Sequence, residues 1–248
     1  SFSNSYECVR QSDILICCYG TPSIFPLPDR NLLINDHIEL TKIIFNELCD
    51  YIHDKIMILN VVNPVDIISN FICNLVNIPK QQLLGISGSH NTARLLVAIE
   101  KETNISIDKI DKESLIVCGE HGDAIVPIMS NIKIQGKYLT DLVPSSTIDI
   151  IIANTKAHGL SIFHDKKSPP VFSPSASVMI VLNIILSRST KIFSGSVWND
   201  QYGCFLSWPI QIIEKAFHTL NITYSPHERM QLESCATKLR QYQENIKS

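Results

Sequence analysis

Three short apolar runs, each followed by a turn or loop and then by a helix-like segment, constrain the fold of this chain more than any other feature. The runs span residues 13–18, 55–62 and 82–86. The segments with helical spacing of apolar residues span 31–53, 63–76 and 90–102. Apolar runs of this length, bounded by turn residues, are typical of strands that are covered on both faces of a parallel sheet. Their alternation with helices predicts an α/β fold with right-handed crossovers.

The pattern changes after residue 113, where strands and helices no longer alternate. We expect strands at 114–118, 131–135, 191–197 and 203–208, and helices at 146–163, 173–188 and 226–245. No low-complexity linker or internal repeat separates this mixed region from the first one. We therefore expect the two regions to pack against each other, with the active cleft between them.

One histidine lies between two glycines directly after the predicted strand at 114–118. The sequence there reads Gly119-Glu120-His121-Gly122-Asp123. The glycines allow positive φ and close approach of a ligand to the backbone, and Asp123 can hydrogen-bond the turn. A histidine at a strand end can donate or accept one proton near neutral pH. Because the motif is short, the alternative of a surface-loop histidine stays open.

Two further motifs precede this turn. Residues 63–66 read Asn-Pro-Val-Asp, and residues 91–94 read Asn-Thr-Ala-Arg. Together with 119–123, their order and spacing resemble the lactate/malate dehydrogenase family, and its malate branch more closely. The resemblance implies an incomplete Rossmann-type parallel sheet followed by an α+β substrate domain. It assigns residues 1–88 to the C-terminal half of a dinucleotide-binding domain and residues 89–248 to the substrate and catalytic domain.

The beginning of the chain departs from that family. The resemblance starts at about Ser12 and implies that the strand at 13–20 is the fourth strand of the nucleotide-binding sheet. In the family, the glycine-rich phosphate turn precedes this strand, and no GxGxxG occurs in these 248 residues. Two interpretations stay open: the sequence is a piece of a longer protein, or the product lacks the first half of the fold.

The resemblance also implies roles for individual side chains. His121 matches the histidine that transfers the proton. Arg94 matches the arginine that clamps the substrate carboxylate, for which a planar fork of two hydrogen bonds is suited. Arg30 matches an arginine on a flap that polarises the substrate carbonyl. Asn63 matches an asparagine that contacts both the substrate and the nicotinamide.

The implied cofactor is NAD, with NADP as the alternative. The resemblance gives Gly20, Val62 and Asn63 the contacts with this cofactor. Two plainer interpretations stay open beside these roles. Arg94 could be a solvent-exposed arginine on a helix face, and Asn63 could act as a helix cap next to Pro64.

Three positions depart from the family pattern. Asn91 stands where the family has the aspartate that pairs with the catalytic histidine, so it can share in catalysis only as an uncharged hydrogen-bonding group. Ser23 stands where the family selects the substrate side chain, and it lacks the charge to bind a second carboxylate. Ser168-Pro169-Pro170 replaces a small or hydroxylated residue of the substrate pocket. Two functions therefore remain: an NAD-dependent 2-hydroxy-acid dehydrogenase, or a dehydrogenase-like protein with impaired catalysis and a structural or interaction role.

Composition limits the partners and the compartment. A net charge of -3 without a clustered basic surface argues against nucleic acid. No apolar run reaches the roughly 18 residues needed to cross a bilayer, which argues against a membrane. The eight cysteines form no CxxC and no metal-ligand spacing, so we expect no metal site and a reducing, cytoplasmic compartment. The resemblance implies a 2-oxo or 2-hydroxy acid substrate and a homo-oligomer, either a dimer or a tetramer.

Overall fold

The computed structural model describes residues 4–21, 30–122, 124–166 and 171–247. Its main sheet has eight strands in the order β1-β2-β3-β8-β9-β4-β5, with β10 paired to β9. These strands are β1 (Ile14–Cys17), β2 (Met57–Asn60), β3 (Leu83–Gly85), β4 (Val117–Gly119), β5 (Ile125–Pro127), β8 (Phe193–Asn199), β9 (Cys204–Ile213) and β10 (Ala216–Thr219). A separate hairpin is formed by β6 (Lys133–Ile134) and β7 (Lys137–Tyr138).

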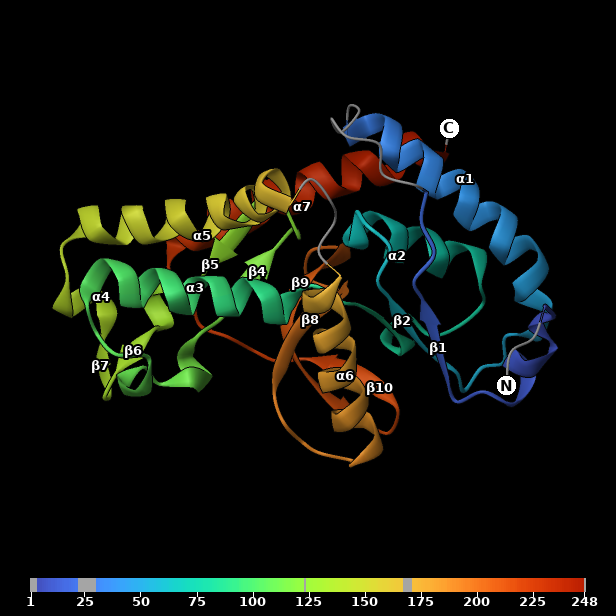
Figure 1. Cartoon of the computed structure of the whole chain (residues 1–248), viewed down its shortest axis with the longest axis horizontal. Coiled ribbons are helices and arrows are strands. Elements are labelled where there is room, and N and C mark those ends of the chain that lie inside the picture. Colours follow the sequence, from blue (N-terminus) through green and yellow to red (C-terminus); the bar gives the residue numbers. More distant parts are fainter. Residues whose placement is uncertain (1–3, 22–29, 123, 167–170, 248) are drawn as a thin grey trace.

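The helices lie around this sheet (Figure 1). They are α1 (Arg30–Leu48), α2 (Val65–Leu75), α3 (Gly88–Thr103), α4 (Leu139–Leu142), α5 (Ser145–Lys166), α6 (Phe172–Leu186) and α7 (Pro226–Lys247). Short 3-10 turns occur at Tyr6–Gln11, Cys49–Tyr51, Lys80–Gln82, Ile107–Lys109, Lys112–Ser114 and Met129–Asn131. None of the helices in the described part of the chain has the length and apolar character that crossing a membrane requires.

The first three strands form the parallel part of the sheet. Ile14 of β1 is level with Met57 of β2, and Ile58 of β2 is level with Leu83 of β3. The predicted α/β fold is therefore confirmed, with α1 and α2 as the connecting helices. The expectation that the first strand is covered on both faces is wrong. β1 lies at one end of the strand order and Ile16 is 37% exposed, whereas every residue of β2 is buried.

The mixed region continues the same sheet. β8 and β9 form a long antiparallel hairpin, and β8 also pairs with β3, where Gly85 is level with Ser196. A Cβ on Gly85 would lie 2.7 Å from Val65 and 2.8 Å from Ser196, so only glycine allows α2 and β8 to approach the strand this closely. One sheet thus crosses the proposed boundary after residue 88, and the division into two domains stays a prediction.

Several element boundaries differ from those expected. The strand predicted at 114–118 is β4 (Val117–Gly119), because a 3-10 turn occupies Lys112–Ser114. The strand predicted at 131–135 shortens to β6, since Gln135 has φ 50° and Gly136 has φ 80° in the tight turn to β7. The predicted helices at 146–163, 173–188 and 226–245 are present as α5, α6 and α7. The elements α4, β5, β7 and β10 were not predicted.

Two apolar clusters form the core. The larger one packs the main sheet against α1, α2 and α7 and includes Ile58, Ile68 and Phe205. The smaller one lies between α3, α5 and the chain around β4, and includes Leu95 and Ile151. Figure 1 shows α3 and α5 side by side. Leu95 and Ile99 of α3 and Val117 of β4 lie in this smaller cluster, which fixes the position of the helix relative to the strand.

Candidate functional site

The turn that carries His121 is fixed by the backbone of the strand before it. Gly119, the last residue of β4, has φ 90°, and a Cβ there would lie 2.6 Å from the carbonyl oxygen of Ala124. Any other residue would be strained at this φ and would also contact the backbone too closely. The amide of Gly122 donates to the carbonyl of Glu120 (2.9 Å) and closes the turn. Asp123, expected to hydrogen-bond this turn, lies outside the described residues.

A buried carboxylate holds the backbone of His121. Its amide donates to Oδ2 of Asp66 (2.7 Å), and the hydroxyl of Ser196 donates to Oδ1 of the same side chain (2.5 Å). Asp66 is 2% exposed. Burial raises the pKa of Asp66 to about 7, although both hydrogen bonds oppose this rise. Asp66 was visible in the motif at 63–66 but received no role from the sequence, because its contact with His121 spans 55 residues.

Asn91 joins the histidine to the arginine. Its Nδ2 lies 3.4 Å from Nδ1 of His121, and its Oδ1 accepts a hydrogen bond from the guanidinium of Arg94 (3.3 Å). Asn91 is fully buried. A guanidinium can only donate hydrogen bonds, so the amide oxygen has to face Arg94 and the amide nitrogen has to face the imidazole. The arrangement therefore brings three of the expected site residues into direct contact.

Arg94 lies in the first half of α3 and is partly buried. Burial lowers the pKa of its guanidinium, but an arginine remains charged throughout the physiological pH range. A charged group that is partly removed from water, and for which the described residues show an uncharged amide oxygen as the hydrogen-bond partner, favours an anionic ligand. This environment suits a carboxylate-binding role better than that of a fully solvated surface residue.

The carboxyl ends of β1 and β2 carry the residues expected at the cofactor. Gly20 and Thr21 follow β1; Val62, which is buried, and Asn63, which is exposed, follow β2. The expectation that Asn63 caps the next helix is wrong: Pro64 is the cap residue of α2, and its carbonyl accepts from Ile68 (2.9 Å). The peptide bond between Asn63 and Pro64 is cis. Asn63 thus directly precedes the cap residue of α2 and is exposed beyond the end of β2.

The terminal helix α7 contacts the histidine turn from another side. The amide of Glu120 donates to Sγ of Cys235 (3.1 Å), and Nζ of Lys238 lies 3.3 Å from Oε2 of Glu120. Glu120 is 9% exposed. Both contacts link Glu120, the residue before His121, to side chains in the middle of α7. Sequence patterns gave no indication of them, since 115 and 118 residues separate the partners.

Some of the expected site positions have no described side chain. Arg30 is the first residue of α1, but its side chain lies outside the described residues. Ser23 and the segment 168–170 also lie outside them. The roles expected for these positions therefore stay predictions.

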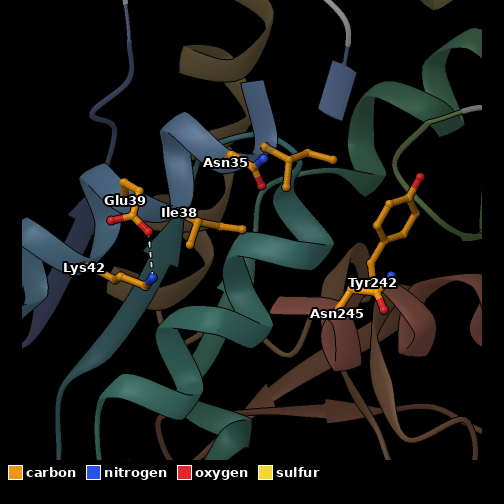
Figure 2. Close-up of a pocket in the computed structure, with 7 residues that line it drawn as sticks. Asn35, Ile38, Glu39, Lys42, Tyr242 and Asn245 are labelled. Carbon is orange, nitrogen blue, oxygen red and sulfur yellow. Dashed lines mark hydrogen bonds and ion pairs between the residues drawn. The ribbon is translucent and has the colours of Figure 1, made fainter. Parts of the chain in front are cut away.

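A cavity of about 350 Å³ lies between α1 and α7 (Figure 2). It is lined by Ile34, Asn35, Ile38, Glu39, Lys42, Tyr242 and Asn245. Figure 2 shows the ion pair between Lys42 and Glu39 (2.6 Å), whose side chains are both exposed. None of His121, Asn91, Arg94 or Asn63 lines this cavity, so it is separate from the candidate site.

Most of the chain matches a known protein family. Residues 91–248 match the lactate/malate dehydrogenase α/β C-terminal domain family. The chain belongs to the lactate/malate dehydrogenase family. The resemblance carried by the three motifs is therefore confirmed. Asn91, Arg94 and His121 all lie within the matched part of this dehydrogenase-family chain.

Individual relatives agree with this assignment. Malate dehydrogenase 1 of Aquifex aeolicus is 30% identical over 79% of this chain and 57% of its own length. The malate dehydrogenase of Chlorobium chlorochromatii is 29% identical over 94% of this chain and 76% of its own length. The chain thus spans little more than half of the Aquifex relative. The lactate dehydrogenase of Cryptosporidium parvum, solved with lactic acid and NAD, has the same fold, with a TM-score of 0.88 at 19% identity over 99% of this chain and 80% of that one.

Proposed function

We propose that the protein is an NAD-dependent 2-hydroxy-acid dehydrogenase of malate or lactate type. One observation carries the proposal: Asn91 contacts both His121 (3.4 Å) and Arg94 (3.3 Å). A proton-transferring group and a carboxylate-binding cation are thereby within reach of one small acid. The malate dehydrogenases among the relatives support the same class of reaction.

Each residue of this site would have a separate role. The forked guanidinium of Arg94 would bind the substrate carboxylate and orient the carbon that reacts. The protonated ring of His121 would donate a proton to the carbonyl oxygen of a 2-oxo acid, and in the reverse direction the neutral ring would accept the proton of the hydroxyl of a 2-hydroxy acid. Arg30 would polarise the same oxygen, and Asn63 would position the substrate from the end of β2.

The cofactor would lie at the carboxyl ends of the parallel strands, where ligands of open α/β sheets bind. NAD supplies the hydride chemistry when bound. The residues present suit one side of it: Gly20 has no side chain, and among the described residues the nearest atom to a Cβ there would be Nε2 of His37, at 3.7 Å. A ribose or ring can therefore approach the backbone. Val62 and the exposed Asn63 would complete this side of the site, and NADP is the alternative cofactor.

A dehydrogenase-like protein with impaired catalysis is the second candidate. It is favoured by Asn91, because an amide carries no charge to offset that of a protonated His121. In this reading the fold would serve a structural or interaction role. The two candidates differ in NADH-dependent turnover of 2-oxo acids, which only the first candidate predicts.

We also propose that the protein forms a homo-oligomer, either a dimer or a tetramer, in a cytoplasmic compartment. Helix α6 exposes Phe172 (85%), Met179 (55%) and Leu186 (74%), an apolar surface that a second copy would cover. The eight cysteines are all free, which suits a reducing compartment. Light scattering of wild-type protein and a Phe172→Ser variant tests the assembly; a monomeric wild type would contradict it.

Oxidation of NADH with a panel of 2-oxo acids tests the proposed reaction. The protein is produced from its complete reading frame, with His121→Asn as the blank and NADPH as a parallel cofactor. We expect turnover that depends on the acid and disappears in the blank. Absence of turnover with every acid, together with intact folding, would reject catalysis and leave the second candidate.

A further inference from the structure

The ends of β1 and β2 lose their backbone pairing close to the proposed cofactor site. The amide of Val61 donates to the carbonyl of Cys17 (2.8 Å), the most distal pairing between these two strands that the described residues show. The chain then continues to Gly20 and Thr21 on one side and to Asn63 on the other. The separation of these two segments sets the width of the space that the nicotinamide would occupy.

His37 of α1 bridges the two strand ends. Its Nδ1 lies 2.5 Å from the carbonyl oxygen of Asn63. Its Nε2 lies 3.3 Å from the amide nitrogen and 3.2 Å from the hydroxyl of Thr21. Both ring nitrogens are therefore engaged, one by each strand end. Sequence patterns assigned no role to His37, because it lies within a helix and between residues with no motif.

The three contacts specify the protonation of the ring. A carbonyl oxygen only accepts hydrogen bonds, so the proton of the neutral imidazole has to be on Nδ1. Nε2 then has a free lone pair and accepts from the amide of Thr21. One tautomer of one residue satisfies both strand ends.

Further hydrogen bonds fix the backbone of α1 at His37, in addition to those of the His37 ring. The hydroxyl of Thr41 donates to the carbonyl of His37 (2.6 Å), and the hydroxyl of Tyr19 donates to Thr41 (2.8 Å). Tyr19 directly precedes Gly20 at the end of β1. Helix α1 is thus hydrogen-bonded to Tyr19, which follows β1, and through His37 to the segments that follow β1 and β2. Because the side chain of His37 belongs to this hydrogen-bond network, it can fix the distance between the two segments.

From this geometry we infer that His37 is a positioning residue, which fixes the separation of the Gly20–Thr21 segment and Asn63 at the nicotinamide side of the site. The role in cofactor binding rests on the proposed function; the bridge itself does not. Substitution of His37 weakens cofactor binding and leaves turnover at saturating cofactor nearly unchanged, because the ring does not touch the reacting atoms.

Two measurements test the bridge without any ligand. The nitrogen chemical shifts of the full-length protein should show His37 with its proton on Nδ1; a proton on Nε2 would overturn the inference. In His37→Phe, which keeps the ring but loses both bonds, exchange of the Thr21 amide should accelerate at least about tenfold. His218→Phe, at an exposed histidine of β10, is the control and should leave this exchange unchanged. Equal exchange rates in His37→Phe and wild type would overturn the bridge.

Cofactor titration tests the positioning role. The Kd for NADH, followed by nicotinamide fluorescence, should rise about 5- to 50-fold in His37→Phe, as expected for the loss of two hydrogen bonds. The kcat at saturating NADH should stay within about twofold, and His218→Phe should match wild type. An unchanged Kd, or a fall in kcat alone, would overturn the positioning role. A wild type that binds no NADH would refute the proposed function and with it this role, while the tautomer and exchange results would still decide the bridge.

Discussion

The Nδ2 atom of Asn91 lies 3.4 Å from Nδ1 of His121, with the amide oxygen turned toward Arg94. The amide nitrogen therefore faces the ring nitrogen as a donor, and the neutral imidazole has its own proton on Nε2. Protonation of the ring would place a second N–H against the amide N–H. Asn91 thus favours the uncharged ring, whereas a carboxylate at this position would favour the charged one.

Arg94→Lys tests the carboxylate clamp. Lysine keeps the charge but loses the planar fork, so one of two parallel hydrogen bonds to the substrate is lost. We expect the KM for the 2-oxo acid to rise about 10- to 100-fold with little change in the Kd for NADH. Steady-state kinetics and NADH titration measure the two quantities. Lys101→Gln, an exposed charge at the end of the same helix, should alter neither; an unchanged KM in Arg94→Lys would remove Arg94 from the substrate site.

Asp66→Asn should change how stability depends on pH. Because the folded-state pKa of Asp66 is raised to about 7 from an ordinary value of 3.8, the folded protein binds more protons than the unfolded one between these pH values. The free energy of unfolding contributed by this group is therefore greatest at low pH and is lost as pH rises through about 7. Asparagine can accept from the His121 amide and donate to Ser196 without a charge.

The measurement compares denaturant unfolding of wild type and Asp66→Asn at pH 5.5 and pH 8. From pH 5.5 to pH 8, we expect the unfolding free energy of the variant to rise by on the order of 2 kcal/mol relative to that of wild type. The difference between the two proteins at each pH cancels the other titrating groups. A pH-independent difference would show that the carboxylate of Asp66 is not destabilised by its burial.

Gly119→Ala tests the turn that presents His121, with Gly136→Ala as a matched control. Both glycines have positive φ, but a Cβ on Gly136 meets nothing within 4 Å, whereas on Gly119 it would lie 2.6 Å from a backbone oxygen. The control should lose about 1–2 kcal/mol of unfolding free energy from the backbone conformation alone. Gly119→Ala should lose at least about 1 kcal/mol more because the backbone has to shift. Equal losses would show that the turn relaxes freely.

The sequence predicts the parallel strands and long helices well, because apolar periodicity and turn residues act locally. β5 was missed since it has three residues and ends at Pro127, and β10 was missed since its four residues form a strand by pairing with β9. In the site, the contact of Asn91 with His121 follows from the family resemblance. The contacts of Asp66, Cys235 and Lys238 with the histidine turn depend on tertiary packing across more than fifty residues, which no local pattern records.

The central claim is that His121, Asn91 and Arg94 act together on one small acid. Asn91→Asp tests it most directly, because it supplies the charge that a protonated His121 needs without changing the size of the side chain. We expect kcat/KM for NADH-dependent reduction of the preferred 2-oxo acid to rise about 10²- to 10⁴-fold, and Asn91→Asp combined with His121→Asn to show no such gain. An unchanged or lower kcat/KM in a folded Asn91→Asp protein would contradict the claim.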